Sequence, residues 1–480
     1  MESSLEDLLQ DIEQSGKGRE VAAFFDFDRT LIAGYSAQAF LEEQLLSGDM
    51  SPGELRSQAA AIVKYSTGRL NFSGLVAETA NVMRGQAEYV FEEFGERVYR
   101  KKVAGAIFPE ARTLLEAHRK MGHTLVIVSS ATKYQIEPAA KELGIEYILC
   151  TDLEIEDDVF TGNVISPTCF GDGKRTAAED FCDELETEMD KSFFYTDSDD
   201  DLPLLDVVGY PRTINPNRKL SRIAKKRDWP ICNFASRSRP TLNQIARTAS
   251  IFTMLPTSLA LTAPLWALTG NKRDAINTAG SIWSDVASAL AGLTYDIEGE
   301  HHLWSDRPAV FIFNHQSSVD PVIVGKLLQR DFTGVGKKEI ERFPLVGPAL
   351  KYADMVFIDR ASTEKAIDAM KPVIKAITED KLSVVLAPEG TRSHGKRLSK
   401  FKKGAFHIAM QAGVPVVPIV IHNAVDSLPK GQNIARPAEI KVTVLPPVPT
   451  DKWTLKNINK QVTDIRQQFL DVLGQEDEDV

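Results

Sequence analysis

Two pairs of chemically competent side chains stand out in this chain, one pair in each half. Asp26 and Asp28 lie in FFDFDRTL, directly after an apolar run. A carboxylate can attack phosphorus to form an aspartyl-phosphate, and a second carboxylate can handle the proton of the leaving group. His315 and Asp320 follow another apolar run in FNHQSSVD. If the chain turns there, Asp320 can fix the tautomer of the imidazole, which could then deprotonate a hydroxyl that attacks a thioester.

Further polar residues follow each pair, near the ends of other predicted strands. Behind the first pair come Ser129, Lys174, Asp197 and Asp201. Phosphate repels carboxylates, so this site needs a cation, and clustered oxygen ligands suit Mg²⁺. Behind the second pair come Arg360 in FIDR, PEGTR at residues 388–392, and Pro415. Arginine forks suit an acceptor that carries phosphate.

The elements that must position these residues are indicated by hydrophobic patterning. Residues 21–28, 124–129, 146–150 and 193–197 are typical of short buried strands, and helical stretches separate them. This alternation predicts a parallel α/β sheet. Between Leu31 and about Ile107 the apolar residues recur at helical spacing, which predicts a helical cap over the carboxyl edge of the sheet. A second α/β run begins near residue 308, with five apolar strands separated by helices.

The bridge between these halves differs from both. Residues 218–247 are rich in Arg and Lys, and residues 248–271 carry no charge. The uncharged stretch could span about 30 Å of hydrocarbon, but Pro256 and Pro264 interrupt it. We expect an interfacial or re-entrant hairpin, with an amphipathic helix over 276–293 lying flat beside it and the basic run facing anionic headgroups. A spanning helix and a buried helix of a soluble protein remain alternatives, and the basic run also fits a solvated last helix of the first domain.

Composition narrows the class of protein. A length of 480 residues predicts two or three domains, and a net charge of −11 argues against a nucleic-acid binder. The four cysteines lack CxxC spacing, which argues against zinc and a disulfide framework. The acidic start lacks the basic and apolar regions of a signal peptide. We therefore expect a reduced protein at the cytoplasmic face of the cell membrane, held peripherally or monotopically.

The motifs DFDRT, VIVSSAT, GDGK and YTDSDDD, in that order, resemble the haloacid dehalogenase superfamily of phosphatases, in the subgroup with a helical cap. The resemblance covers about residues 20–235 and implies Asp26 as nucleophile and Asp28 as general acid and base. It also implies a set of phosphate and metal ligands: Ser129 and Lys174 for the phosphoryl group, and Asp26, the Asp28 backbone and Asp197 for Mg²⁺, supported by Asp201. Phosphoserine phosphatases of this subgroup carry a Glu nine positions after the nucleophile. Tyr35 stands there in this chain, which argues against an amino-acid substrate.

The second half resembles the glycerolipid acyltransferases, in particular 1-acylglycerol-3-phosphate acyltransferases. NHQSSVD, KKEIERFPLVG with FIDR, PEGTRS and VPVVPI occur in the family's order across residues 300–450. The resemblance implies His315 as the base and Asp320 as its partner. It implies substrate-binding residues in the later motifs: Lys338, Arg360 and Arg392 for the acceptor phosphate, with Glu389 and Gly390 in the substrate-binding turn. Lys402 and Lys403 are either further phosphate contacts or solvated lysines.

Together these observations predict an α/β chain in four parts. A Rossmann-like phosphatase domain with a cap at about 32–107 takes residues 1–240, and a membrane-associating helical segment takes 241–300. A glycerolipid acyltransferase domain takes 301–455, and a terminal helix with an acidic tail takes 456–480. The expected function is acyl transfer from acyl-CoA or acyl-carrier protein to lysophosphatidate, giving phosphatidate, together with Mg²⁺-dependent hydrolysis of an unidentified phosphomonoester. The alternatives are an acyltransferase with a regulatory phosphatase-like half, and a lipid-binding scaffold without turnover.

Overall fold

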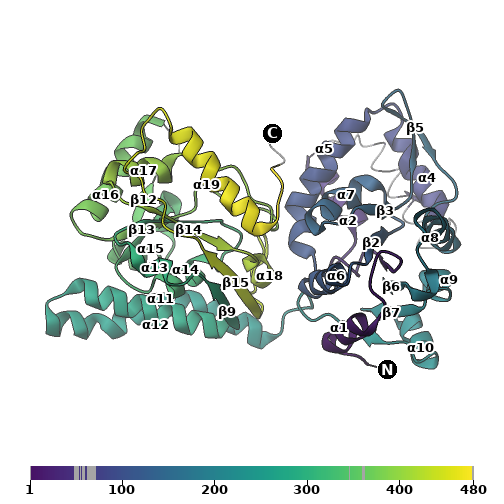
Figure 1. Cartoon of the computed structure of the whole chain (residues 1–480), viewed down its shortest axis with the longest axis horizontal. Coiled ribbons are helices and arrows are strands. Elements are labelled where there is room, and N and C mark those ends of the chain that lie inside the picture. Colours follow the sequence, from purple (N-terminus) through teal and green to yellow (C-terminus); the bar gives the residue numbers. More distant parts are fainter. Residues whose placement is uncertain are drawn as a thin grey trace. The chain divides into compact units, whose positions relative to one another are not determined.

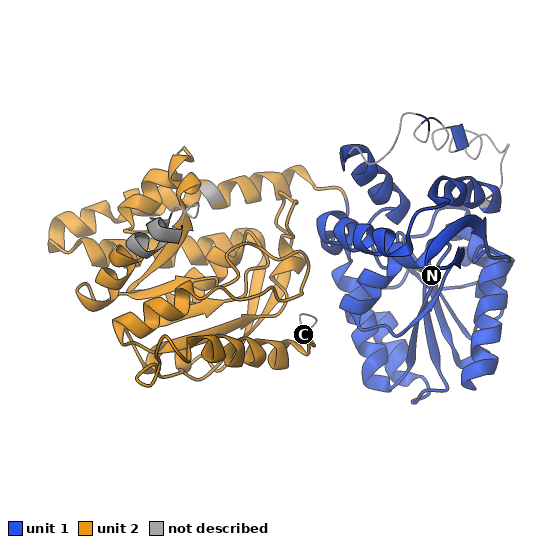
Figure 2. Cartoon of the chain, turned by 90° about the horizontal axis from the view of Figure 1, so that it is seen from above, with its two compact units in different colours: residues 1–238 blue, residues 239–480 orange. Residues whose placement is uncertain are grey.

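The computed structural model describes residues 2–47, 72–344, 346–358 and 363–477, together with residues 53, 56, 60 and 61. The chain divides into two compact units, Met1–Ser238 and Arg239–Val480 (Figure 2). Each unit is an α/β fold built on its own sheet (Figure 1). The predicted α/β fold class, with a parallel sheet in the first half and a second α/β domain after it, is confirmed.

Unit 1 contains a six-stranded sheet in the order β3-β2-β1-β6-β7-β8, and every neighbouring pair is parallel. Its strands are β1 (Ala22–Phe25), β2 (Thr124–Val128), β3 (Tyr147–Leu149), β6 (Phe193–Thr196), β7 (Tyr210–Ile214) and β8 (Ile231–Cys232). The four predicted strands are β1, β2, β3 and β6, and β7 and β8 extend the sheet beyond β6.

Helices cover both faces of this sheet because successive residues of a strand point to opposite sides. Ala23 and Phe25 belong to a core with α1 and α6, whereas Ala22 and Phe24 belong to a second core with α8, α9 and α10. These helices are α1 (Leu5–Gln14), α6 (Pro109–Met121), α8 (Asp172–Leu185), α9 (Leu202–Leu205) and α10 (Arg218–Lys226). Most of the basic run lies on α10, which buries Leu220 in unit 1. The basic run is therefore better interpreted as the last helix of the first domain than as a segment that faces lipid headgroups.

The cap of unit 1 combines helices with a hairpin. Its described helical part comprises α2 (Ser36–Ser47), α4 (Phe72–Met83), α5 (Glu88–Val98) and the short turns Tyr99–Val103 and Ala104–Ala106. A two-stranded hairpin, β4 (Leu153–Glu156) and β5 (Val159–Val164), contributes Leu153 and Phe160 to the same small core as Ala80, Met83 and Phe91. Tyr134, from α7 (Lys133–Leu143), completes that core. The cap is therefore built from two separate insertions, of which the sequence indicated only the first.

Unit 2 contains a seven-stranded mixed sheet in the order β12-β11-β13-β10-β14-β15-β9. β15 runs antiparallel to β14, whereas the other neighbouring pairs are parallel. The strands are β9 (Leu293–Glu298), β10 (Val310–Phe313), β11 (Phe332–Lys337), β12 (Val356–Ile358), β13 (Ser383–Leu386), β14 (Val416–Ile421) and β15 (Ala438–Val444). β9 lies inside the expected helical segment 241–300, so the helical part ends earlier, at Ala291.

Helices also cover both faces of this second sheet. Phe311 packs with α12 and α14, whereas Val310 and Ile312 pack with α16, α17 and α19. The helices of unit 2 are α11 (Leu242–Thr269), α12 (Lys272–Ala291), α13 (His302–Ser305), α14 (Asp320–Leu328), α15 (Val346–Tyr352), α16 (Thr363–Thr378), α17 (Gly404–Ala412), α18 (Ala424–Ser427) and α19 (Ile458–Leu473). The 3₁₀ turn η5 (Lys338–Arg342) follows β11.

α11 and α12 form a helical hairpin along one side of unit 2 (Figure 1). Arg247 of α11 donates to the carbonyls of Leu290 (2.8 Å) and Ala289 (3.0 Å), which closes the carboxyl end of α12. The apolar stripe of α12 packs into the core of unit 2, where Trp283 and Leu290 contact it. We expected that stripe to lie on a membrane. This expectation is wrong for α12, because its apolar residues are already covered by α14 and the sheet.

Candidate active sites

The first site lies where β1 and β6 end. Asp26 follows β1, and its N–H donates to the carbonyl of Tyr195 in β6 at 2.9 Å. Asp197 follows β6, and both carboxylates are buried. Because β1 and β6 are parallel neighbours, their carboxyl ends place Asp26 and Asp197 at one edge, the usual ligand edge of such sheets.

Lys174, in the first turn of α8, links two carboxylates of this site. Its Nζ lies 2.9 Å from Asp26 Oδ1 and 3.0 Å from Asp201 Oδ2. Burial alone would lower the pKa of Lys174, but the charges of Asp201 and Asp26 outweigh burial and raise it. The Thr196 hydroxyl also donates to Asp201, at 2.6 Å. Asp201 therefore holds Lys174 as a cation against Asp26, and its expected support of the Mg²⁺ ligands stays a prediction.

Asp28 contacts the start of the cap. Its Oδ1 accepts from the Ser36 backbone N–H at 2.7 Å, and its Oδ2 accepts from the Ser36 hydroxyl at 3.2 Å. Burial raises the pKa of Asp28 to about 6, although the bonds from Ser36 oppose that rise. A carboxyl group that titrates near neutrality can both donate and accept a proton. Sequence analysis did not identify Ser36, which lies ten residues after Asp26 and is the first residue of α2.

The structure places two further residues at this edge. Ser129 follows β2, is buried, and accepts from the Ala131 N–H at 3.3 Å. Arg29, which sequence analysis missed, forms an ion pair with Asp197 at 3.0 Å. Its backbone adopts a positive φ of 60°, at the turn after Asp28. An arginine directly after the two aspartates was the available signal, because the chain leaves the sheet there. The predicted residues Asp26, Lys174, Asp197 and Asp201 are thus brought together.

The second site lies after β10. His315 Nδ1 lies 2.6 Å from Asp320 Oδ2, and the N–H groups of Gln316 and Ser317 donate to the same oxygen at 2.8 and 2.9 Å. Asp320 is fully buried as the first residue of α14, and its Oδ1 has no hydrogen-bond partner among the described residues. This arrangement orients the imidazole through Nδ1, leaves Nε2 for a substrate, and keeps a negative charge beside an imidazolium.

The PEGTR turn holds the backbone of His315 from two sides. Glu389 Oε1 accepts from the His315 N–H at 2.6 Å, and Glu389 Oε2 accepts from the Ser399 N–H at 3.0 Å. The Ser393 N–H donates to the His315 carbonyl at 2.7 Å. Burial raises the pKa of Glu389 to about 7. Sequence analysis assigned Glu389 to substrate binding, but both of its oxygens bind backbone N–H groups and so position the loop that carries His315.

The other residues predicted to bind substrate differ in their distance from His315 and in their exposure. Gly390 adopts a φ of +77°, and a Cβ there would lie 3.0 Å from Lys402 Nζ, so this turn requires glycine. Arg392 donates to the Ser318 hydroxyl, inside the loop from His315 to Asp320. Lys338 is exposed on η5. Arg360 lies outside the described residues.

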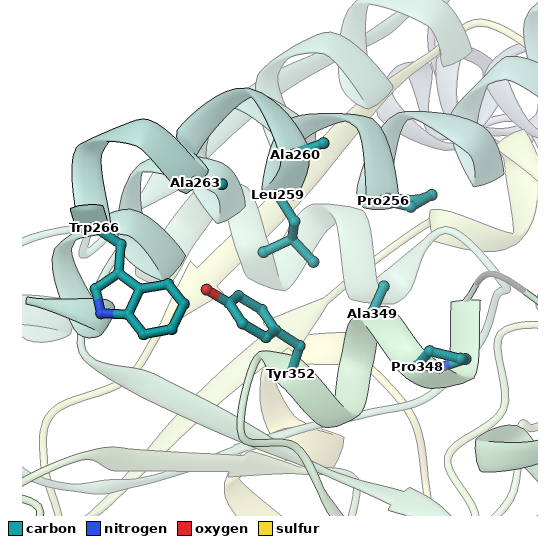
Figure 3. Close-up of a pocket in the computed structure, with 8 residues that line it drawn as sticks. All are labelled: Pro256, Leu259, Ala260, Ala263, Trp266, Pro348, Ala349 and Tyr352. Carbon is teal, nitrogen blue, oxygen red and sulfur yellow. The ribbon is translucent and has the colours of Figure 1, made fainter.

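An apolar groove of about 460 Å³ lies between α11 and α15 in unit 2 (Figure 3). Its walls come from both helices: Pro256, Leu259, Ala260, Ala263 and Trp266 from α11, and Pro348, Ala349 and Tyr352 from α15. Only the Tyr352 hydroxyl and the indole nitrogen of Trp266 are polar among these side chains. The groove offers a surface to hydrocarbon rather than to water.

Comparison with known proteins supports both resemblances. Residues 23–206 match the haloacid dehalogenase-like hydrolase family, and residues 294–422 match the Acyltransferase family. A 1-acyl-sn-glycerol-3-phosphate acyltransferase from Limnanthes alba is 37% identical over 194 residues, which cover 40% of this chain and 68% of the relative. The alpha form of that enzyme from Homo sapiens is 35% identical over 183 residues, covering 38% and 65%.

A crystal structure of a 1-acyl-sn-glycerophosphate acyltransferase from Thermotoga maritima is 19% identical, with a TM-score of 0.40, and covers 48% of this chain and 97% of that chain. From the sequence matches, the chain belongs to the 1-acyl-sn-glycerol-3-phosphate acyltransferase family and carries a haloacid dehalogenase-like hydrolase domain before the acyltransferase domain. Both predicted resemblances are confirmed.

Proposed function

We propose that this chain is a bifunctional, membrane-associated enzyme. Unit 2 transfers an acyl chain from acyl-CoA or acyl-carrier protein to 1-acylglycerol-3-phosphate and forms phosphatidate. Unit 1 hydrolyses a phosphomonoester through an aspartyl-phosphate. The observation that carries the acyltransferase proposal is the 2.6 Å contact between His315 and a fully buried Asp320 in a member of this family.

Acyl transfer follows from the orientation of His315. Its Nε2 takes the proton of the acceptor's free hydroxyl while the oxygen attacks the thioester carbonyl. Asp320 stabilises the imidazolium that forms, and the same proton then passes to the departing thiolate. The products are the new ester and a free thiol. Arg392, in contact with Ser318 of the same loop, would hold the acceptor phosphate near His315.

Phosphoester hydrolysis follows from the two aspartates after β1. Asp26 attacks phosphorus, and Asp28 supplies a proton to the departing alkoxide. Asp28 then takes a proton from the water that cleaves the aspartyl-phosphate, which restores both side chains. Lys174 and Ser129 would hold the oxygens of the phosphoryl group. Asp28 accepts hydrogen bonds from Ser36, whereas Asp26 contacts Lys174. The two carboxylates therefore have different partners, which suits their different roles.

The first site fits Mg²⁺ on the chemistry of its donors. Burial raises the pKa of Asp26 and of Asp197, and neighbouring carboxylates raise both further. Among the described residues no three His, Cys, Asp or Glu side chains could hold a metal alone. The proposed set needs only two, Asp26 and Asp197, with the backbone carbonyl of Asp28. When bound, Mg²⁺ would neutralise charge on the phosphoryl oxygens.

The polarity of α11 supports contact with a membrane. Ser258 is 0% exposed, with Thr248 and Thr262 also buried, whereas Leu261 is 65% and Leu268 86% exposed. Small polar residues inside and large apolar residues outside suit helices packed in lipid. Within the described chain no single helix is long and apolar enough to cross a membrane, but the two halves of α11, bent by 47°, together reach that length and composition. The bend falls at residue 252, four residues before Pro256. A proline ring inside a helix clashes with the carbonyl of the residue four positions before it, which accounts for a bend at that place.

We further propose a small, water-soluble phosphomonoester as the substrate of unit 1. Tyr35 is exposed beside Arg29, whose Nη1 lies 3.5 Å from its hydroxyl. No carboxylate stands at position 35 to bind an ammonium group. The competing proposal is a lipid phosphate, in which unit 1 would dephosphorylate the product of unit 2. Side-by-side kcat/KM values for glycerol phosphate and phosphatidate distinguish these two proposals.

The experiment that tests the bifunctional proposal uses two variants of the full chain. Asp26→Asn cannot form the aspartyl-phosphate, so it should abolish phosphatase turnover and retain acyl transfer. His315→Ala should lower acyl transfer by about 10² or more and retain phosphatase turnover. An Asp26→Asn protein that loses both activities while folded would contradict two separate sites. Acyl transfer without any phosphatase turnover in the parent chain would favour a regulatory unit 1.

A further inference from the structure

Two residues with a left-handed backbone are hydrogen-bonded to each other beside the first site. Arg29, directly after Asp28, has a φ of 60°, and Asn215, directly after β7, has a φ of 48°. Asparagine adopts this conformation readily, but arginine does so at a cost in free energy. Such a residue persists only where its surroundings hold it, and residues of this kind cluster at functional sites. Contacts around Arg29 must therefore hold this turn.

Both polar groups of the Arg29 backbone have partners. Its N–H donates to the Gly34 carbonyl at 3.1 Å, and its carbonyl accepts from Asn215 Nδ2 at 3.0 Å. Arg29 Nη2 in turn donates to the Asn215 carbonyl at 3.2 Å. The backbone directly after Asp28 is thus held by Gly34 of the same turn and by a residue 186 positions further along the chain.

Asn215 also holds the last segment of unit 1. Its Oδ1 accepts from the Phe234 N–H at 2.8 Å, and its own N–H donates to the Cys232 carbonyl at 2.9 Å. The Phe234 ring packs edge-on against Phe108, with 5.2 Å between the ring centroids. The two polar atoms of the Asn215 side chain therefore serve different segments: the nitrogen bonds the turn after Asp28, and the oxygen bonds Phe234.

We infer that Asn215 is a positioning residue for Asp28. This inference rests on the proposed phosphoester hydrolysis and deepens it, because Asn215 lies outside the four motifs. Ser36 holds the side chain of Asp28, and Asn215 holds the backbone that follows it through Arg29. A general acid acts only within hydrogen-bond reach of the departing oxygen. A shift of this turn should therefore impair proton donation by Asp28 more than attack by Asp26.

The test compares Asn215→Gly and Asn215→Asp with the parent chain. Glycine adopts a φ of 48° without strain and removes both side-chain contacts. Aspartate keeps an acceptor for the Phe234 N–H but has no N–H for the Arg29 carbonyl, and it adds a negative charge. An effect shared by both variants therefore comes from the lost bond to Arg29. Asp228→Gly, at an exposed residue of unit 1 with a φ of 54°, is the matched control.

The kcat/KM is measured for two phosphoesters that differ in their need for a general acid. When Asp26 attacks glycerol phosphate, the P–O bond to glycerol breaks and the alkoxide takes the proton of Asp28. The p-nitrophenolate ion leaves p-nitrophenyl phosphate as a stable anion without a proton. Both Asn215 variants should lower kcat/KM by about 10- to 100-fold for glycerol phosphate and by less than about threefold for p-nitrophenyl phosphate. Asp228→Gly should match the parent with both esters.

Three results would overturn the inference. Equal losses with both esters would indicate a purely structural role, and no loss with either would show that Asp28 does not depend on Asn215. A loss in Asn215→Gly that Asn215→Asp does not share would assign the effect to the bond with Phe234. Thermal unfolding of each variant shows that the compared proteins are folded.

A second measurement needs no turnover. The Ser36 N–H donates to Asp28 Oδ1 at 2.7 Å, so its hydrogen exchange reports on the position of that carboxylate. Exchange at Ser36 should be severalfold faster in both Asn215 variants and unchanged in Asp228→Gly. If the parent hydrolyses neither ester, the proposed function fails and exchange at Ser36 alone decides the inference. Unchanged exchange there would overturn it.

Discussion

Replacement of Glu389 by Gln should change both the pH dependence of the stability of unit 2 and its acyl-transfer activity, because Glu389 is buried and bonded to the backbone of the His315 loop. The Glu389 side chain is only 3% exposed, and each of its oxygens accepts one backbone N–H. Burial raises its pKa from 4.5 to about 7. Glutamine has nearly the same shape and carries no titrating proton, but its amide nitrogen cannot accept one of the two backbone N–H groups. The variant therefore loses one hydrogen bond at every pH, and the effect of ionisation is measured by the pH slope rather than by the absolute stability.

The magnitude follows from the difference between the two pKa values. A rise from 4.5 to about 7 is about 2.5 units, and at about 1.36 kcal/mol per unit this corresponds to about 3 kcal/mol. The folded protein keeps the Glu389 proton to higher pH than the unfolded chain does. The contribution to the free energy of unfolding is therefore full below pH 4.5 and is lost as the pH rises through about 7.

Urea unfolding of the full chain, measured at several values between about pH 5 and 8, tests this reasoning. The parent should lose about 3 kcal/mol over that range through Glu389, and Glu389→Gln should lack that loss. Glu439→Gln, on the exposed side of β15, serves as the control. Equal pH slopes for the parent and Glu389→Gln would refute the assigned pKa.

The same variant should slow acyl transfer. At about pH 8 the parent offers a carboxylate to the His315 N–H, and a hydrogen bond to a charged group contributes about 1.5–3 kcal/mol, so kcat should fall by about tenfold or more. Substrate KM values should change less, because Glu389 touches the loop backbone. A glutamine variant with the parent's kcat would show that the contact does not position His315.

Three further outcomes are expected. Burial lowers the pKa of His118 well below 6.5, so the free energy of unfolding of unit 1 should fall as the pH drops below about 6.5, and His118→Gln should flatten that fall in denaturation curves. Leu261→Asp combined with Leu268→Asp should reduce co-sedimentation with anionic vesicles while a water-soluble phosphomonoester is still hydrolysed; unchanged sedimentation would contradict membrane contact through α11. Ser36→Ala removes one of two hydrogen bonds to Asp28 and should lower phosphatase kcat severalfold with no change in acyl transfer, whereas a change in both would indicate general unfolding.

Apolar runs that end in a polar motif were sufficient to predict the strands that position both sites. The runs before Asp26 and His315 are fully buried strands with helices on both faces, so almost every side chain must be apolar. The hairpin β4–β5 was missed because it covers only the cap. β4 is only four residues long, β5 shows no regular alternation of apolar and polar residues, and the acidic turn at 157–158 resembles a loop. β9 was missed because it follows directly on the helical periodicity of α12.

The contacts between the site residues were harder to predict from the sequence than the strands. Spacing predicted the contact of His315 with Asp320, because both belong to one local turn. It could not predict that Glu389 would bind the His315 backbone 74 residues away, or that Lys430 would meet Arg392 across 38 residues. Such contacts depend on the order of strands in the sheet, which a single sequence does not specify. The roles assigned to the site residues remain predictions for the experiments above.

The hydrogen bonds between the PEGTR turn and the His315 backbone have a consequence for how the acceptor preference of this chain could change. Glu389 and Ser393 hold the N–H and the carbonyl of His315, so an exchange anywhere in that turn disturbs the general base and the acceptor contact together. Mutations there are coupled, and few of them are neutral. Lys337 ends β11 and Lys430 lies in the loop after α18, so neither belongs to that turn. We expect natural or directed evolution of acceptor preference to proceed through positions outside the turn first, while the turn itself stays fixed.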